Sequence, residues 1–300
     1  MNTTNSDPHK YKILFIGVFD RTGKSTNTSQ LLAFKKLGYN IVGYPYRQKA
    51  QQISSQQRDE HLLKTVKENK FDLIIYSKCN GIPNKIVKEI NAITTTCLWF
   101  MDPLVSYTPE MEERLALVDF ACFDKINVLE KAKKISDTCF YVCEGYDSFT
   151  EKPYKDLEHK YDVGFVGNLY GNRQSILNAI SHKVIVSNNI FGFDHPRLIS
   201  QTKINLNICT DHGASDRIYK IMAANGFLLS DDWVGRKEHF VDGKDLIIYK
   251  DIMDLNKKIK YYLSHDLERQ QIANQGYETV QQFTRINWAQ KIMEIYEQFR

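Results

Sequence analysis

The stretch NLNICTDHGASDRIYKIMAANGFLLSDD, residues Asn205 to Asp232, decides the fold that we predict for this chain. An apolar strand over Ile204 to Cys209 leads through a polar loop into a helix that opens at Ser215, and a second apolar strand follows over Phe227 to Ser230. This order is typical of a βαβ unit in a parallel sheet, where ligands bind beyond the carboxyl ends of the strands. We therefore expect a ligand site where this helix begins.

Polar and charged residues gather at that point. They are His212, Gly213, Ser215, Asp216, Arg217 and, one turn further along, Lys220. A helix N-terminus favours anions through its free N–H groups and its dipole, and Arg217 and Lys220 add positive charge on about the same face. The sequence therefore predicts a site for a phosphate-bearing ligand. Two alternatives stay open: a surface ion pair between Asp216 and Lys220, and an exposed loop position for His212.

The rest of the chain repeats this alternation of strands and helices. One series opens on YKILFIG (Tyr11 to Gly17) and a second on YDVGFVG (Tyr161 to Gly167), with the polar segment Glu144 to Lys160 between them. Such alternation favours parallel sheets covered by helices on both faces. We predict an α/β fold of two Rossmann-like domains with C-terminal helices. The predicted domains are residues 1–155 and 156–286, and a last helix, 287–300, is expected to pack back on the first domain.

Apolar runs and helical periodicity place the individual elements. In the first domain, strands are predicted over 11–17, 40–44, 71–76, 95–100, 119–123 and 138–142, and helices over 26–37, 59–69, 83–90 and 127–134. In the second, strands are predicted over 161–167, 182–187, 204–209, 227–230 and 245–249, and helices over 173–180, 195–200 and from 215. Three helices follow, over 252–264, 267–283 and 288–299.

Composition narrows the class of protein. A chain of 300 residues with 42% hydrophobic residues can fill two cores, and a net charge of +4 with interleaved acids and bases argues against a nucleic-acid binder. The polar start MNTTNSDPHK does not resemble a signal peptide, and no apolar run reaches the length of a transmembrane segment. The six cysteines lie mostly in apolar runs without a CxxC pair, so we expect reduced, buried thiols and a cytoplasmic protein.

The loop GVFDRTGKST (Gly17 to Thr26) resembles a phosphate-binding P-loop but has the wrong spacing. The Walker A pattern has four residues between its first glycine and the Gly-Lys pair, and here there are five. One extra residue would misplace the amides that bind phosphate, which argues against a nucleoside triphosphatase. The loop still lies at the ligand edge of its sheet, so candidates for an acceptor or cleft surface are Asp20, Arg21, Thr22 and Gly23. Ser25 or Thr26 can also simply cap the following helix.

Other candidate site residues lie directly after predicted strands in the sequence, or within one. Asp231 and Asp232 are adjacent, and neighbouring side chains of an extended chain project in opposite directions, so we expect helix capping or sugar contact and no metal site. Asp102 precedes Pro103 and is a turn-forming residue by default, with acceptor binding or general-base action as the alternative. Trp99 is expected in the core or in a cleft wall, where its ring would suit a sugar.

Several segments resemble the CgeB/YkvP-like group of glycosyltransferases. The stronger ones are VGFVGNLYGNR (163–173), KINLNI (203–208), SDRIYKIMAANGFLLSDD (215–232), HFVDGKDLIIY (239–249) and IKYYLSHDLERQQIANQGYETVQQFT (259–284). In the first half, YPYR (44–47), LWFMD (98–102) and EGYD (144–147) resemble the group more weakly.

The resemblance implies a GT-B fold, two Rossmann-like domains facing across a cleft, with the nucleotide sugar held mainly by the second. It implies retaining, metal-independent transfer from a nucleotide-diphosphate sugar, most simply a UDP-sugar, to a glycan, protein or small-molecule acceptor. No permanently bound cofactor is expected. The residues it places at the donor are Gly167, Asn168, Arg173, His212, Gly213, Ser215, Asp216, Tyr219, Asp231 and Asp232. Arg217 and Lys220, with Asp102, form the expected catalytic set.

One residue departs from the pattern of this group. Related transferases commonly have a glutamate on this helix, in a pattern like RIFEALACG, which holds the ribose hydroxyls. Here RIYKIMAAN has Lys220 at that place. Either Asp231, Asp232 or Glu238 then binds the ribose, or the donor is seated differently. The departure also supports an alternative function, a catalytically inactive homologue that binds a nucleotide or sugar.

Overall fold

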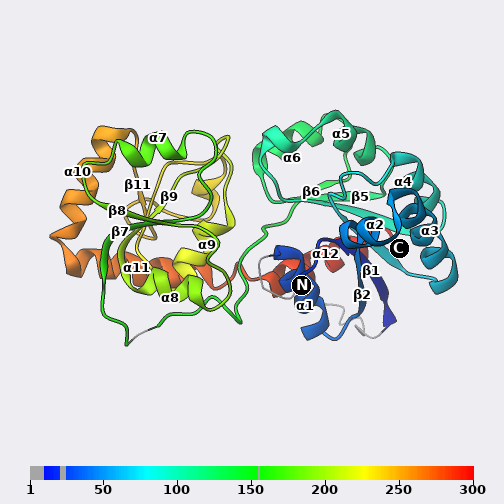
Figure 1. Ribbon diagram of the computed structural model, residues 1–300, viewed down its shortest axis with the longest axis horizontal. Coiled ribbons are helices and arrows are strands. Elements are labelled where there is room, and N and C mark those ends of the chain that lie inside the picture. The colour runs from blue at the N-terminus through cyan, green and yellow to red at the C-terminus, as the bar shows by residue number, and fades with distance from the viewer. Residues whose placement is uncertain (1–9, 21–24, 155) are drawn as a thin grey trace. The chain divides into compact units, whose positions relative to one another are not determined.

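The computed structural model describes residues 10–20, 25–154 and 156–300 and contains two compact units. Unit 1 comprises Met1–Cys143 and Arg285–Arg300, and unit 2 comprises Glu144–Thr284. Each unit has one parallel β-sheet flanked by helices (Figure 1). The predicted α/β fold with two parallel sheets and C-terminal helices is therefore confirmed.

The sheet of unit 1 has six parallel strands in the order β2-β1-β3-β4-β5-β6. Their bounds are β1 (Lys12–Gly17), β2 (Asn40–Pro45), β3 (Leu73–Ser77), β4 (Thr95–Phe100), β5 (Phe120–Phe123) and β6 (Cys139–Tyr141). The central strands, such as LIIYS in β3, are buried along their whole length. Strands of a parallel sheet are covered on both faces, which is why they are almost continuously apolar.

Two groups of helices cover this sheet. Helices α3 (Ser55–Asn69), α4 (Asn84–Asn91), α5 (Pro109–Leu115) and α6 (Ile126–Ala132) share one apolar cluster with the sheet, and α1 (Thr26–Lys36) and α12 (Arg285–Tyr296) share the other. The predicted helices of this unit are all present. The sequence patterns missed α2 (Tyr46–Ile53) and α5, as well as a short 3₁₀ turn, η2 (Leu104–Ser106).

Helix α12 brings Trp288 into the core of unit 1. Its ring centroid lies 5.3 Å from that of Trp99, 5.4 Å from that of Phe34 and 6.2 Å from that of Phe15. Trp99 is completely buried in this aromatic cluster. Of the two positions expected for Trp99, the core and a cleft wall, the structure shows the core.

The sheet of unit 2 has five parallel strands in the order β11-β10-β9-β7-β8. The strands are β7 (Tyr161–Val166), β8 (Val184–Ser187), β9 (Thr202–Asn207), β10 (Leu228–Ser230) and β11 (Ile247–Ile248). The helices are α7 (Arg173–Asn178), α8 (Asp194–Ser200), α9 (Asp216–Ala223), η3 (Arg236–Glu238), α10 (Ile252–Leu263) and α11 (Asp266–Val280). In Figure 1, α7 and α8 lie on opposite sides of the sheet.

Strand β11 is shorter than the predicted strand 245–249. The carboxylate of Asp245 accepts hydrogen bonds from Val241 N and from Thr279 Oγ1, and Gly243 N donates to the carbonyl of Leu246. These bonds hold residues 241–246 in a turn, so the strand begins at Ile247, and Ile247 and Ile248 pair with Leu229 and Ser230 of β10.

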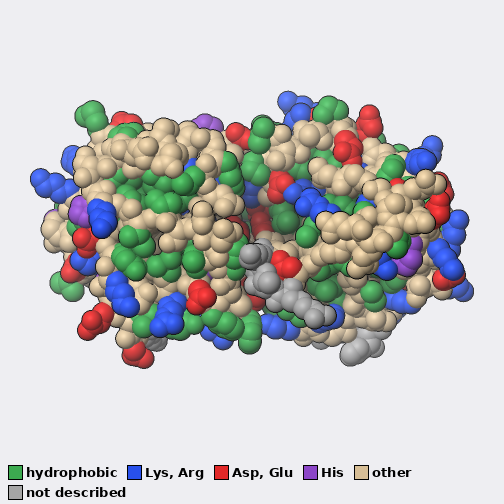
Figure 2. Space-filling view, viewed as in Figure 1, with side chains coloured by type: hydrophobic (Ala, Val, Ile, Leu, Met, Phe, Trp, Pro, Cys, Tyr) green, Lys and Arg blue, Asp and Glu red, His purple; other side chains and the backbone are tan. Residues whose placement is uncertain are grey.

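None of the helices formed by the described residues is long and apolar enough to cross a membrane. Five of the six cysteines are buried, and Cys143 is partly buried. On the face seen in Figure 2, basic and acidic side chains are scattered over each unit without forming one extended field of a single charge.

Candidate functional site

The candidate site lies in unit 2, where β7 and β9 end side by side. Arg217, in the first turn of α9, extends its side chain back over these strand ends. Its Nε donates to the carbonyl oxygen of Val166 (2.6 Å), and its Nη1 donates to Oδ1 of Asn207 (2.9 Å). Only 8% of Arg217 is exposed. The guanidinium is therefore held in one orientation by the ends of two neighbouring strands.

Gly167, the residue after β7, lies against this guanidinium. A Cβ atom at Gly167 would stand 2.3 Å from Nη2 of Arg217, and the glycine has a φ of +150°. Both the space and the backbone conformation require glycine here. Nη2 makes no hydrogen bond with any residue that the structure describes, so it is the atom that Arg217 can offer to a ligand beside Gly167.

A second guanidinium, that of Arg173 at the start of α7, lies nearby and is 2% exposed. Its three nitrogens donate to the carbonyl oxygen of Ile208 (3.1 Å), the carbonyl oxygen of Asn168 (3.0 Å) and Oγ1 of Thr210 (3.2 Å). Arg173 thereby joins the loops that follow β7 and β9.

Both arginines lie over the ring of Phe165 on β7. Cζ of Arg217 is 4.6 Å from the ring centroid and Cζ of Arg173 is 5.8 Å from it. Arg173 also lies 4.3 Å from the ring centroid of Tyr170. Cation–π contacts of this kind hold a guanidinium without neutralising it.

Every hydrogen-bond acceptor of the two arginines is uncharged. Within residues 10–20, 25–154 and 156–300, no carboxylate forms an ion pair with either guanidinium. Burial, and then the positive charge of Arg173, lower the pKa of Arg217 to about 10, at which it remains a cation at neutral pH. Two buried positive charges without a carboxylate partner are costly in free energy, and a bound anion would relieve that cost.

Lys220 lies one turn along α9 from Asp216, and its Nζ is 2.5 Å from the Asp216 carboxylate. The ion pair that the spacing allowed is therefore formed. The Lys220 side chain is 22% exposed, and its pairing with Asp216 places the ammonium near the first turn of α9, which also contains Arg217.

The loop between β9 and α9 is tightly turned. Asp211 and His212 both have positive φ, 51° and 52°, and Thr210 bridges to Gly213, whose N–H donates to the Thr210 carbonyl. His212 is exposed, and its carbonyl oxygen accepts a hydrogen bond from Val234 N. Ser215 directs its Oγ to Oδ1 of Asn207 (2.9 Å). The loop is thus fixed to β9 and to the loop after β10.

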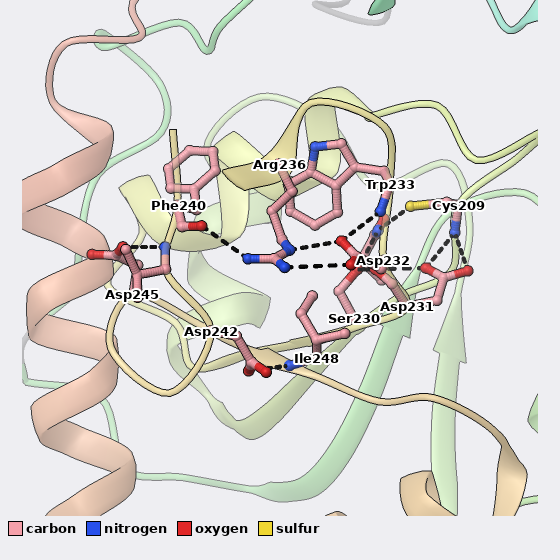
Figure 3. Close-up of polar contacts among 12 residues, drawn as sticks. Cys209, Ser230, Asp231, Asp232, Trp233, Arg236, Phe240, Asp242, Asp245 and Ile248 are labelled. Atoms are coloured by element: carbon pink, nitrogen blue, oxygen red, sulfur yellow. Dashed lines mark hydrogen bonds and ion pairs between the residues drawn. The ribbon is translucent and has the colours of Figure 1, made fainter. Parts of the chain in front are cut away.

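The two adjacent aspartates after β10 have different partners (Figure 3). The Asp231 carboxylate accepts from Cys209 N at 2.9 and 3.1 Å, which ties β10 to the end of β9. Burial raises the pKa of Asp231, and the Cys209 N–H opposes this shift. Asp232 pairs with Arg236 (2.6 Å), which lowers the pKa of Asp232. The described residues hold no cluster of three or more His, Cys, Asp or Glu placed for a metal ion.

Tyr219, another residue predicted at the donor, lies in the interior of unit 2. It is 1% exposed, and its ring packs on those of Phe240 and Phe283, 6.0 and 5.7 Å between centroids. Helix α9 turns Arg217 toward the strand ends and Tyr219, two residues later, into this aromatic core. Asn168 contacts Arg173 through its carbonyl, and its side chain is exposed.

The candidates of unit 1 lie at the carboxyl edge of its own sheet. Asp102 follows β4 and forms an ion pair with Lys78. Asp20 lies after β1, and its N–H donates to Thr28 Oγ1 (3.1 Å). Arg21, Thr22 and Gly23 lie outside the described residues.

The sequence patterns missed Asn207. It is completely buried at the end of β9 and contacts Arg217, Ser215 and Ser230. A signal was present: the run INLNI has polar asparagines at alternate positions of an otherwise apolar central strand, where a buried polar side chain must find partners.

Comparison with known proteins places this geometry in context. Residues 151–295 match the model of a family described as glycosyl transferase-like. No curated protein shows significant sequence similarity to the chain. The family match is broader than the CgeB/YkvP-like group, and membership of that group stays a prediction.

Solved structures resemble the chain over most of its length. A glycosyltransferase from Rickettsia africae ESF-5 is 12% identical, with 96% of this chain and 98% of that one covered and a TM-score of 0.67. Anabaena HepE in complex with UDP-glucose is 13% identical, with 96% and 100% covered and a TM-score of 0.67. Sucrose-phosphate synthase from Thermosynechococcus elongatus is 11% identical, with 96% and 99% covered and a TM-score of 0.71. The fold is that of GT-B glycosyltransferases.

Proposed function

We propose that this chain is a glycosyltransferase that moves a sugar from a nucleotide-diphosphate sugar, with a UDP-sugar as the leading candidate, to a glycan, protein or small-molecule acceptor. The observation that carries the proposal is the pair of buried guanidiniums, Arg217 beside Gly167 and Arg173 nearby, whose hydrogen-bond acceptors among the described residues are all uncharged. A diphosphate supplies the negative charge that this pair lacks. The glycosyl transferase-like match over residues 151–295 and the UDP-glucose complex of Anabaena HepE support the same donor class.

The proposed reaction needs stabilisation of a leaving group. The bond between the anomeric carbon and the diphosphate oxygen breaks, a bond from that carbon to the oxygen of an acceptor hydroxyl forms, and the proton of that hydroxyl passes to the departing diphosphate. Negative charge grows on the departing diphosphate, and positive groups that are already in place stabilise it most effectively. We assign this role to Arg217 Nη2, Arg173 and Lys220. In this proposal they do what a divalent cation does elsewhere, and transfer proceeds without metal and with retention of configuration.

We assign the donor to unit 2 and the acceptor to unit 1. The family match lies largely on unit 2, which contains both arginines. In unit 1, Asp102 and Asp20 at the carboxyl edge of the sheet are the candidate acceptor contacts. The mostly buried cysteines fit a reducing compartment, the cytoplasm.

Hydrolysis of nucleotide sugars in the absence of acceptor tests the proposal. We expect the purified protein to release nucleoside diphosphate from at least one UDP-, GDP- or dTDP-sugar, and to release the sugar first in the anomeric form of the donor, as measured by NMR. Binding of nucleotide sugars without turnover, in the presence of any glycan or small acceptor tried, would instead support the inactive, nucleotide-binding homologue.

Substitution of Arg217 tests the location of the site. Arg217→Ala should lower turnover and nucleotide affinity by at least about tenfold, because it removes a charged hydrogen-bond donor. Arg269→Ala is the matched control: Arg269 is also a buried arginine of unit 2, but it donates to Asp266 and to the Tyr262 carbonyl. Wild-type kinetics in Arg217→Ala would show that the donor binds elsewhere.

A further inference from the structure

Asn207 connects the candidate anion site to three strand ends. It is the last residue of β9 and is completely buried. Its Oδ1 accepts from Arg217 Nη1 and from Ser215 Oγ, both at 2.9 Å. Its Nδ2 donates to Ser230 Oγ at 2.9 Å and to Cys209 Sγ at 3.2 Å. An asparagine amide has two donor hydrogens and two acceptor lone pairs, so Asn207 uses its full capacity.

The orientation of this amide is fixed by its partners. The guanidinium of Arg217 can only donate hydrogen bonds, so the atom that faces it must be the oxygen of Asn207. A rotated amide would place two sets of N–H groups against each other. Asn207 therefore sets the direction of Arg217, together with the Val166 carbonyl, and leaves Nη2 directed at Gly167.

Asn207 also differs in charge from the partners of three buried arginines elsewhere in this chain. Arg236 pairs with Asp232, Arg58 with Asp59 and Arg114 with Glu110. In those pairs a carboxylate compensates the guanidinium. The amide of Asn207 gives Arg217 a hydrogen bond of similar geometry without a negative charge, so the full positive charge of Arg217 remains for a ligand.

We propose that Asn207 is a positioning residue of the donor site: it orients Arg217 and keeps its charge available for a diphosphate. This inference rests on the proposed function and adds a determinant of donor affinity on the buried strand below the site. Asn207 does not touch the ligand in this proposal. It acts through Arg217, and through Ser215 it also fixes the start of α9.

A matched pair of substitutions tests the proposal. Asn205 is a second buried asparagine of β9, two residues earlier on the same face, and among the described residues its Nδ2 donates to the carbonyls of Ile199 and Thr202. We expect Asn207→Ser to weaken binding of UDP and of inorganic pyrophosphate about ten- to hundredfold, measured by isothermal titration calorimetry. Asn205→Ser should leave both affinities of the folded protein within about twofold of wild type.

The substitution Asn207→Asp separates the effect of charge at this position from the effect of its hydrogen bonds to Arg217 and Ser215. A carboxylate at this position can still accept from Arg217 and Ser215, so we expect a folded protein whose melting temperature is not below that of Asn207→Ser. Its negative charge compensates Arg217, so UDP and pyrophosphate should bind at least about tenfold more weakly than to wild type.

The possible failures are distinct. Wild-type affinity for pyrophosphate and UDP in both Asn207 variants would overturn the positioning role while leaving the proposed function intact. Equal losses of UDP and pyrophosphate affinity in Asn205→Ser and Asn207→Ser would show a general effect of changes in strand β9. That result would also overturn the positioning role of Asn207. A wild-type protein that binds neither pyrophosphate nor any nucleoside diphosphate would overturn the proposed function, and this inference with it.

Discussion

Gly167 is packed so closely against Arg217 that a single methyl group on the glycine would lie 2.3 Å from the Nη2 atom of the arginine. The arginine cannot move away freely, because its Nε and Nη1 are bonded to Val166 and Asn207 in the protein interior. The absence of a side chain at residue 167 is therefore a condition for the position of the guanidinium.

Substitution of Gly167 by alanine should displace Arg217. We expect Gly167→Ala to lower UDP affinity at least about tenfold and to destabilise the protein by about 1–3 kcal/mol, through steric overlap and an unfavourable φ. Gly192→Ala is the control, since Gly192 also has a positive φ, 59°, but has open space around it. Calorimetric titration and urea unfolding measure the two effects. Unchanged affinity in Gly167→Ala would mean that the displaced guanidinium does not contact the ligand.

Removal of metal ions should leave the reaction intact. In the proposed mechanism Arg217, Arg173 and Lys220 stabilise the diphosphate, so turnover of the nucleotide sugar in excess EDTA should stay within about twofold of the untreated rate. Rates measured after dialysis against EDTA, with and without added Mg²⁺ or Mn²⁺, check this. A large loss that Mn²⁺ restores would rule out the metal-independent mechanism.

Substitution of Lys220 tests whether this residue contacts a phosphate or only forms a surface ion pair. Lys220→Ala should weaken UDP binding about tenfold, because a charged donor is lost, while the free energy of unfolding changes by less than about 1 kcal/mol. Lys258→Ala is the comparison: its pair with Asp254 has the same i,i+4 spacing and similar exposure. If both variants bind UDP like wild type, Lys220 is only the partner of Asp216.

Asp231 and Asp232 should respond to pH in opposite directions. Burial raises the pKa of Asp231 in the folded state, so its contribution to stability is greatest below the unfolded pKa and is lost as pH rises through the folded value. Arg236 lowers the pKa of Asp232, whose contribution is present above the unfolded pKa and is lost as pH falls through the folded value.

Unfolding measured from acid to neutral pH tests these signs. The stability of wild type relative to Asp231→Asn should fall as pH rises, and relative to Asp232→Asn it should rise. Because the Asp232 side chain is half-exposed, its effect should be the smaller one. Parallel slopes for the two variants would contradict the assignment of their environments.

Trp288 should dominate the stability of unit 1. Trp288→Ala removes a ring that contacts Trp99, Phe34 and Phe15 and should destabilise unit 1 by about 3–5 kcal/mol. Trp288→Phe should destabilise unit 1 much less, because the indole nitrogen has no hydrogen-bond partner among the described residues and no hydrogen bond is lost. Limited proteolysis with mass spectrometry identifies which unit opens. Equal protection of unit 1 in Trp288→Ala and wild type would contradict this role.

The sequence predicted the strands of both sheets because buried parallel strands such as LIIYS are unbroken apolar runs. It missed α2 because YRQKAQQI is almost entirely polar, and only Tyr46 is buried there. It missed α5 because PEMEERL is a short helix without a clear period. Those helices are held by the core of unit 1 rather than by a pattern of their own.

Within the candidate site, the helix-terminal position of Arg217 and the glycine after β7 were readable from the sequence. The partners of Arg217 were not, because hydrogen bonds to the Val166 carbonyl and the Asn207 amide join residues far apart in the chain. The surroundings of Tyr219 were not readable for the same reason. Neighbouring positions on α9 point in different directions, and only the packing of Phe240 and Phe283 shows where Tyr219 lies.

Helix α12 has a consequence for the order in which the protein forms during synthesis. Unit 2 is one continuous segment, Glu144–Thr284, whereas unit 1 needs Arg285–Arg300 to cover the sheet face that carries Trp99 and Phe15. When residues 12–143 leave the ribosome, that face has no α12 to cover it. Unit 2 can therefore complete its core first, and the apolar face of unit 1 stays exposed to chaperones or to other chains until residues 285–300 have been synthesised.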